Sequence, residues 1–160
     1  HFTGMSSRDA QTLWSGGRDS HNAIAERAIS DGCGNPCRHC LEMIKKDEPF
    51  LVFSHRPFEA KHAYAEQGPI FLHASPCLAY ASSHGHLPPV LKDSPQFLMR
   101  GYSGDERIVY GTGSVVERCD IIDRARALFD NKAVVFIDIR SAQNNCWQAR
   151  IMKNDDSSVG

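Results

Sequence analysis

The sequence has no excess of charge and no long apolar run. Its 160 residues carry 18 Lys and Arg against 19 Asp and Glu, for a formal net charge of −1 at pH 7. This balance argues against a nucleic-acid partner held by bulk electrostatics. The longest uncharged apolar run, Ala133 to Ile137, is far below the ~20 residues that span a bilayer. Because the N-terminus also shows no apolar segment of a signal peptide, we expect a soluble, cytoplasmic protein with no membrane partner.

The glycine motifs that bind nucleotide phosphates are missing as well. Neither G-x-G-x-x-G nor G-x-x-x-x-G-K-[ST] occurs. The glycines of 110–113 follow a strand-like run but open no clear helix, and we interpret them as a turn or bulge. The sequence therefore does not predict a doubly wound nucleotide-binding fold.

Alternation of apolar and polar residues predicts strands over most of the chain. The expected strands are Phe50–His55, Ile70–Ala74, Gln96–Tyr102, Arg107–Thr112, Ala133–Arg140 and Cys146–Met152. A short helix is expected at Asp9–Trp14 with Ser6 or Ser7 as its N-cap. The one main helix is expected at Asp120–Asp130, where apolar residues recur at helical spacing.

These elements predict a single α+β domain over residues 1–153, followed by a disordered polar tail, 154–160. The sheet should be largely antiparallel with five or six strands, and the helix 120–130 should pack on it. Short connections pair Gln96–Tyr102 with Arg107–Thr112, and Ala133–Arg140 with Cys146–Met152, as hairpins. The last hairpin should be central, because Val134 to Ile137 is apolar on both faces.

Six cysteines are present: Cys33, Cys37, Cys40, Cys77, Cys119 and Cys146. In a protein expected to be intracellular, free thiols or metal ligands are favoured over disulfides. Cys119 in a helical pattern and Cys146 beside Trp147 are predicted to be small buried apolar residues. Cys33, Cys37 and Cys40 have the spacing that holds a four-iron cluster in radical S-adenosylmethionine enzymes, but the chain is too short for the barrel of such enzymes.

A second combination of donors is Cys37, Cys40, His73 and Cys77. Two thiolates on a tight turn, with an imidazole and a thiolate from a second segment, are ligands that tetrahedral zinc prefers. Zinc is therefore a possible cofactor, with His39 and Cys33 as substitute ligands. The alternative is that the two cysteines of the turn pack into the core while His73 bonds a neighbouring carbonyl.

Arginines beside apolar strands suggest a site for a small anionic ligand. Arg38 and Arg56 each lie near a proline-stiffened turn, and with His73 and Arg140 they could converge on one concavity. The alternatives are that the arginines pair with internal carboxylates, of which Asp31, Glu42, Glu66 and Asp138 are available, or that they lie on a solvated sheet face. On such a face Asp138 would pair with Arg140 or Arg150 across strands for a few tenths of a kcal/mol, and this is the favoured interpretation of the strand arginines.

Cys37 or Cys77 with His39 or His73 could also form a nucleophilic pair, since a thiolate needs a nearby base or positive charge. Two hypotheses of function stand: a module that binds a metal or a small anion, which we favour, and a thiol-dependent enzyme. Whether the protein is an enzyme, and its oligomeric state, stay open.

Six separated segments carry a resemblance to a known family. They read DGCGNPCRHCL (31–41), SHRPF (54–58), GPIFLH (68–73) with Cys77, LMRGY (98–102), RIVYGTG (107–113) and RSAQNNC (140–146). In this order they resemble the bacterial family called domain of unknown function 1203. The resemblance implies a stand-alone bacterial protein of about this length, starting near Phe2, and implies no activity. Its motifs contain Cys37, Arg38, Arg56, His73, Cys77, Arg140 and Cys146.

Overall fold

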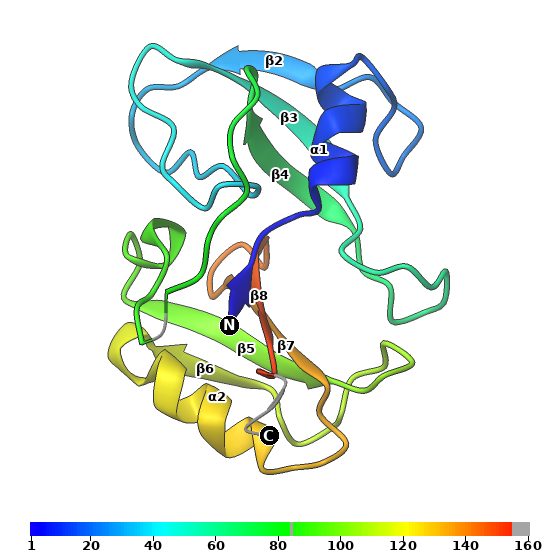
Figure 1. The fold of residues 1–160 in the computed structure, drawn as a ribbon, viewed down its shortest axis with the longest axis vertical. Helices are drawn as coiled ribbons and strands as arrows, with labels where there is room; N and C mark the ends of the chain where they lie inside the picture. Colours follow the sequence, from blue (N-terminus) through cyan, green and yellow to red (C-terminus); the bar gives the residue numbers. More distant parts are fainter. Residues whose placement is uncertain (84, 155–160) are drawn as a thin grey trace, which may run out of the picture.

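The computed structural model describes residues 1–83 and 85–154 (Figure 1). The strands are β1 (Phe2–Thr3), β2 (Glu26–Ile29), β3 (Pro49–His55), β4 (Gly68–His73), β5 (Gln96–Tyr102), β6 (Ser114–Glu117), β7 (Phe136–Ser141) and β8 (Trp147–Met152). The helices are α1 (Ser7–Trp14) and α2 (Ile121–Phe129), with 3-10 turns η1 (Pro89–Leu91) and η2 (Arg118–Asp120). The predicted α+β class and single domain are confirmed. Of the predicted tail, residues 155–160 lie outside the described residues, whereas Asn154 Oδ1 accepts a hydrogen bond from the His1 amino group at 3.0 Å.

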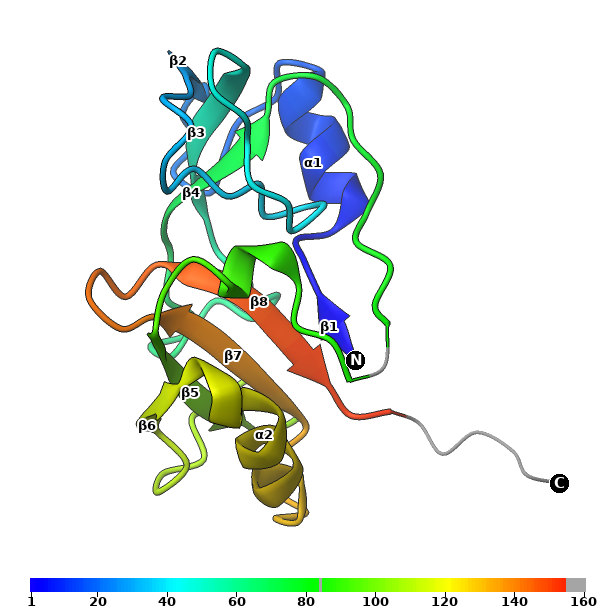
Figure 2. The same cartoon turned by 90° about the vertical axis from the view of Figure 1, so that its left-hand side faces the viewer.

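The strands form two antiparallel sheets instead of the one expected. Five strands follow the order β1-β8-β7-β5-β6, and three follow the order β2-β3-β4 (Figures 1 and 2). The strand predictions were largely sound, but alternation along a strand says nothing about which sheet it joins. Each sheet has its own main apolar cluster, and Trp147 of β8 joins the cluster of the three-stranded sheet, so burial of apolar side chains also connects the two sheets.

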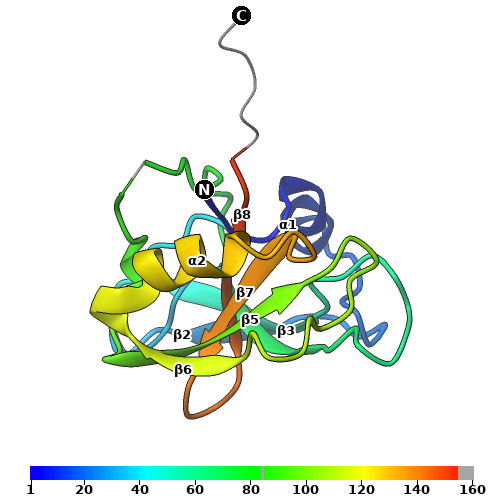
Figure 3. The same cartoon turned by 90° about the horizontal axis from the view of Figure 1, so that it is seen from below.

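Each helix packs on one of the two sheets. The Ser6 hydroxyl accepts a hydrogen bond from Asp9 N at 3.1 Å and caps α1, whose Ala10 and Leu13 join the cluster of the three-stranded sheet. Helix α2 buries three side chains, Ile121, Ala125 and Leu128, against the five-stranded sheet, which it crosses in Figure 3. Both helices match their predicted positions to within two residues.

The predicted strand Arg107–Thr112 is wrong. These residues make only an isolated bridge, between Ile108 and Tyr102, and the partner of β5 on this side is β6, four residues that were not predicted. Glu106 has a φ of 60° in the preceding turn, and Thr112 Oγ1 accepts a hydrogen bond from Gly101 N at 2.9 Å. Side-chain hydrogen bonding thus competes with the strand ladder in this segment.

The last hairpin is central, as predicted. Strand β7 lies between β5 and β8, and its Ile137, Asp138 and Ile139 are fully buried. It begins at Phe136, three residues later than predicted.

The strand arginines do not lie on a solvated face, so that interpretation is wrong. Arg150 pairs across β7 and β8 with the fully buried Asp138, with Nε 2.6 Å from Oδ1 and Nη2 3.0 Å from Oδ2. The guanidinium of Arg150 also lies 3.8 Å from the centroid of the Phe136 ring. Aromatic cover therefore replaces the solvent that was expected over this pair.

Among the described residues, no helix combines the length and apolar character that a membrane span requires.

Candidate metal centre

Cys37 and Cys40 lie on one tight turn of the chain. The Leu41 amide donates a hydrogen bond to the Cys37 carbonyl at 2.9 Å, and Leu41 adopts a φ of 56°. The turn sits against the three-stranded sheet, because the Arg38 amide donates to the Phe71 carbonyl of β4 at 2.9 Å. Since β4 ends at His73, this contact brings the turn to the end of the strand where His73 and Cys77 lie.

The four predicted zinc donors form one group in the structure. The Sγ atoms of Cys37, Cys40 and Cys77 and a ring nitrogen of His73 all lie within 4.8 Å of one another. Cys37 Sγ is 3.8 Å from Cys77 Sγ, and Cys40 Sγ is 3.6 Å from His73 Nδ1. Cys37 is fully buried, and the other three residues are partly buried. The group could hold one metal ion.

A second layer of side chains surrounds these donors. Glu48 Oε2 lies 3.6 Å from His73 Nε2, on the side of the ring away from Cys40. His39 places Nδ1 3.4 Å from Cys77 Sγ and Nε2 2.9 Å from the Ser7 hydroxyl. Sequence reasoning named His39 as a substitute ligand and as a base for a thiol nucleophile, and it missed Glu48 and Ser7. No local signal marks these two, because the contacts join distant segments.

The side chains of the group differ in their pKa shifts. Hydrogen bonds from the Cys40 side chain, and then from His73, hold the pKa of the Cys37 thiol well below its usual range. The hydrogen bond with Cys37 raises the pKa of the Cys40 thiol, and burial raises that of Cys77. A hydrogen bond between His73 and Cys37 raises the pKa of the His73 imidazole. The directions of these pKa shifts favour ionisation of Cys37 before Cys40 and Cys77, and a bound cation would help to ionise all three thiols.

The other predicted anion-binding residues have different surroundings. Arg38 is buried and donates from Nε to the Trp147 carbonyl and from Nη1 to the Pro36 carbonyl, both at 2.8 Å. Arg140 lies with Nη2 3.1 Å from Glu66 Oε2. Arg56 lines a large cavity described below, and His73 belongs to the cysteine group. That the four bind one anion together stays a prediction.

The remaining cysteines lie apart from the group of four. Cys33 and Cys119 are exposed, and Cys146 is partly buried. The prediction of a buried Cys119 is therefore wrong: the residue falls in the 3-10 turn η2, ahead of the helix, where its side chain faces outward with Sγ 3.6 Å from Asp120 Oδ1.

Cys37, the predicted nucleophile, exposes 0% of its surface. His39, one of its predicted bases, directs Nδ1 to Cys77. Because a nucleophilic thiol must be reached by its substrate, this geometry disfavours Cys37 as a nucleophile.

The fold and these donors define a small α+β protein with a Cys3His group able to hold a metal ion. The chain belongs to the family described as protein of unknown function (DUF1203), whose model matches residues 34–153. The match includes all four donors and leaves out β1, α1 and β2. Neither a curated protein nor a solved structure matches the chain.

Proposed function

We propose that the protein binds one zinc ion through Cys37, Cys40, His73 and Cys77, and that the ion is structural. The spacing of the donor atoms carries this proposal. A zinc tetrahedron with Zn–S bonds of about 2.3 Å and a Zn–N bond of about 2.0 Å has S···S edges of about 3.8 Å and S···N edges of about 3.6 Å. The Cys37–Cys77 and Cys40–His73 contacts, at 3.8 and 3.6 Å, have these lengths.

The donor set supports zinc over harder cations. Three thiolates and an imidazole suit a borderline-soft ion, whereas magnesium and calcium prefer oxygen ligands. Four protein ligands complete the tetrahedron and leave no position for a substrate, which is typical of structural zinc. Such an ion would fasten the turn at Cys37 to the end of β4 and to the irregular segment that follows it.

The second layer also fits a zinc ligand. A metal-bound histidine commonly directs its other ring nitrogen to a carboxylate, which fixes the ring. Glu48 stands in that position, 3.6 Å from His73 Nε2.

Metal analysis of the protein purified without chelator tests the proposal. We expect near-stoichiometric zinc, and we expect Cys40→Ser to lose most of it and to melt roughly 5–10 °C lower, because a lost ligand weakens both the ion and the fold. Cys33→Ser is the matched control, since Cys33 lies on the same loop, is exposed, and is outside the donor group.

The control should keep the zinc content and the melting temperature of the wild type. A Cys40→Ser protein with unchanged zinc and unchanged melting would contradict the proposal.

A further inference from the structure

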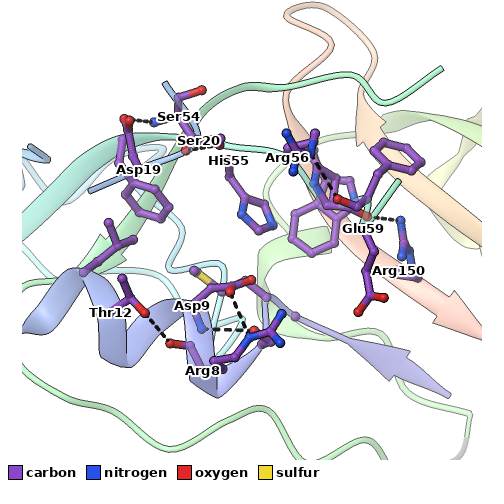
Figure 4. A pocket seen from close by; sticks show the side chains of 18 of the residues that line it. Arg8, Asp9, Thr12, Asp19, Ser20, Ser54, His55, Arg56, Glu59 and Arg150 are labelled. Carbon is purple, nitrogen blue, oxygen red and sulfur yellow. Dashed lines mark hydrogen bonds and ion pairs between the residues drawn. The ribbon is translucent and has the colours of Figure 1, made fainter. Parts of the chain in front are cut away.

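A cavity of about 750 Å³ opens beside α1 (Figure 4). Its wall combines α1, the end of β3 with the loop that follows, and β8. None of the four zinc donors lines it. The volume falls within the usual range for sites that bind small molecules.

Arg56 is the wall's most available cation. Its Nε donates to the Phe58 carbonyl at 3.2 Å, and its two terminal nitrogens have no hydrogen-bond or ion-pair partner among residues 1–83 and 85–154. The neighbouring Arg150 is already held by both oxygens of Asp138. Arg8 lies at the rim, 80% exposed and 3.6 Å from Asp9.

Two of the wall's carboxylates are held by the backbone and do not compensate Arg56. Asp19 accepts hydrogen bonds from the amides of His21, Ala23 and Ser54. Glu106 accepts hydrogen bonds from the amides of Glu59 and Ala60. Arg18 also lines the wall, but it is exposed and donates from Nη1 to the Asn22 carbonyl at 3.0 Å. An anion at the partly buried part of the wall therefore meets the guanidinium of Arg56 with free N–H groups.

His55 is a buried polar group that faces the same cavity. It is 8% exposed, and its ring makes no hydrogen bond within the described part of the chain. Figure 4 shows the imidazole extending from the end of β3 toward α1. The ring nitrogens can therefore form a hydrogen bond with a ligand in the cavity.

The imidazole is neutral at physiological pH. Burial lowers the pKa of His55 to about 4, opposed by Asp9 and reinforced by Arg150, Arg38 and Arg56. A neutral imidazole offers one donor and one acceptor, so it can bond a hydroxyl or one oxygen of a carboxyl group without adding charge.

Apolar side chains complete the wall. Leu13 from α1, Phe53 from β3 and Phe58 from the following loop line the cavity, and all three are buried. The occupant should therefore carry a hydrocarbon body next to its charged group.

We propose that this cavity binds a small organic monocarboxylate, with the carboxylate on Arg56, a polar atom on His55 and the hydrocarbon body against Leu13, Phe53 and Phe58. Of the two partly buried guanidinium groups of the wall, that of Arg150 is paired with Asp138, whereas that of Arg56 has no carboxylate partner among the described residues, so a single negative charge matches it. A phosphate monoester carries up to two charges, and the second would face Asp9 and Glu59, which also line the wall. The proposal does not depend on zinc.

Benzoate tests the proposal, with benzamide as the neutral analogue of the same shape and phenyl phosphate as the more highly charged one. Ligand-detected NMR and thermal shift should show millimolar or tighter binding of benzoate, and at least tenfold weaker binding of the other two. Arg56→Gln should weaken benzoate binding at least tenfold, because it removes the charge-assisted pair. Arg126→Gln should leave the affinity unchanged, since Arg126 is an exposed residue of α2 and does not line the cavity.

Zinc content and melting temperature, measured on each variant, separate a lost ligand contact from a lost fold. His55→Phe serves as a second variant, because it keeps a ring of similar volume and removes only the polar atoms. We expect it to lower benzoate affinity several-fold. Absence of benzoate binding, equal binding of benzoate and benzamide, or unchanged affinity in a folded Arg56→Gln protein would overturn the proposal.

Discussion

The burial of His55 links one side chain to the stability of the whole protein. Its pKa is lowered to about 4 in the folded state, chiefly by burial, against an ordinary value of about 6.5 in an unfolded chain. Between these two values the unfolded state binds more protons than the folded state. The contribution of His55 to the free energy of unfolding is therefore fully present above about pH 6.5 and is lost as the pH falls toward 4.

We expect acidification from pH 7 to pH 4 to cost roughly 3 kcal/mol through His55 alone, since each pKa unit corresponds to about 1.4 kcal/mol. Urea unfolding of the wild type and of His55→Phe, followed across this range, checks the prediction. The variant should lack this component of the pH dependence. The prediction is wrong if the two proteins lose stability in parallel.

Strand β7 is the element on which the larger sheet depends. It pairs with β5 on one side and β8 on the other, and its side chains are buried on both faces. An exposed strand face tolerates polar substitution, but a strand covered on both faces does not.

Ile137→Asp is therefore expected to unfold the protein, at a cost above about 4 kcal/mol, because it buries an unpaired charge beside Asp138. Val135→Asp is a matched control, since Val135 precedes the strand and is 42% exposed. Circular dichroism and melting curves should show the control folded and the Ile137 variant unfolded. A soluble Ile137→Asp protein with an unchanged melting curve would refute the central placement.

The elements that could be predicted from the sequence are those with strong periodicity. The alternation in β3, β5 and β8 and the helical spacing in α2 identified them because one face of each is buried. Strand β2 was missed because its four residues are mostly exposed and show no apolar alternation. Strand β6 was missed because only Val116 among its four residues is buried.

The candidate metal centre was easier to predict than the cavity. Cysteine and histidine are few and chemically distinctive, and the C-x2-C turn is a local feature. The sequence suggested Arg56 as an anion ligand, but with Arg38, His73 and Arg140 as its companions. The cavity joins α1, β3 and β8, and it places Arg56 with His55, whose importance comes from the hydrogen-bond partner that it lacks among the described residues. Sequence spacing does not show whether a side chain lacks a hydrogen-bond partner in the fold.

At the scale of the whole molecule, α1 connects the two proposed sites. One side of the helix touches the metal centre through the Ser7 hydroxyl and His39, and Trp14 Nε1 donates to the His73 carbonyl at 2.8 Å. Another side carries Asp9 and Leu13 on the cavity wall. If zinc fixes His73 and Cys77 as proposed, it also steadies the helix that borders the cavity.

Removal of zinc by a chelator should therefore speed amide hydrogen exchange in α1 and in residues 33–44 by roughly tenfold or more, which corresponds to losing about 1.4 kcal/mol of local stability. Helix α2 packs on the other sheet and should exchange at an unchanged rate. Hydrogen exchange with mass spectrometry measures all three segments in one experiment. Equal acceleration in α1 and α2 would show global unfolding and contradict this coupling.

The pairing of β1 with β8 limits the order in which parts of the fold can form during synthesis of the chain. Phe2 lies opposite Ile151, so β1 leaves the ribosome long before its partner β8 has been made. Residues 26–77, by contrast, hold a complete three-stranded sheet and all four zinc donors. The cavity also needs β8, which supplies Trp147 and Arg150 to its wall. In a growing chain, the residues for metal capture are therefore in place well before the second site can exist.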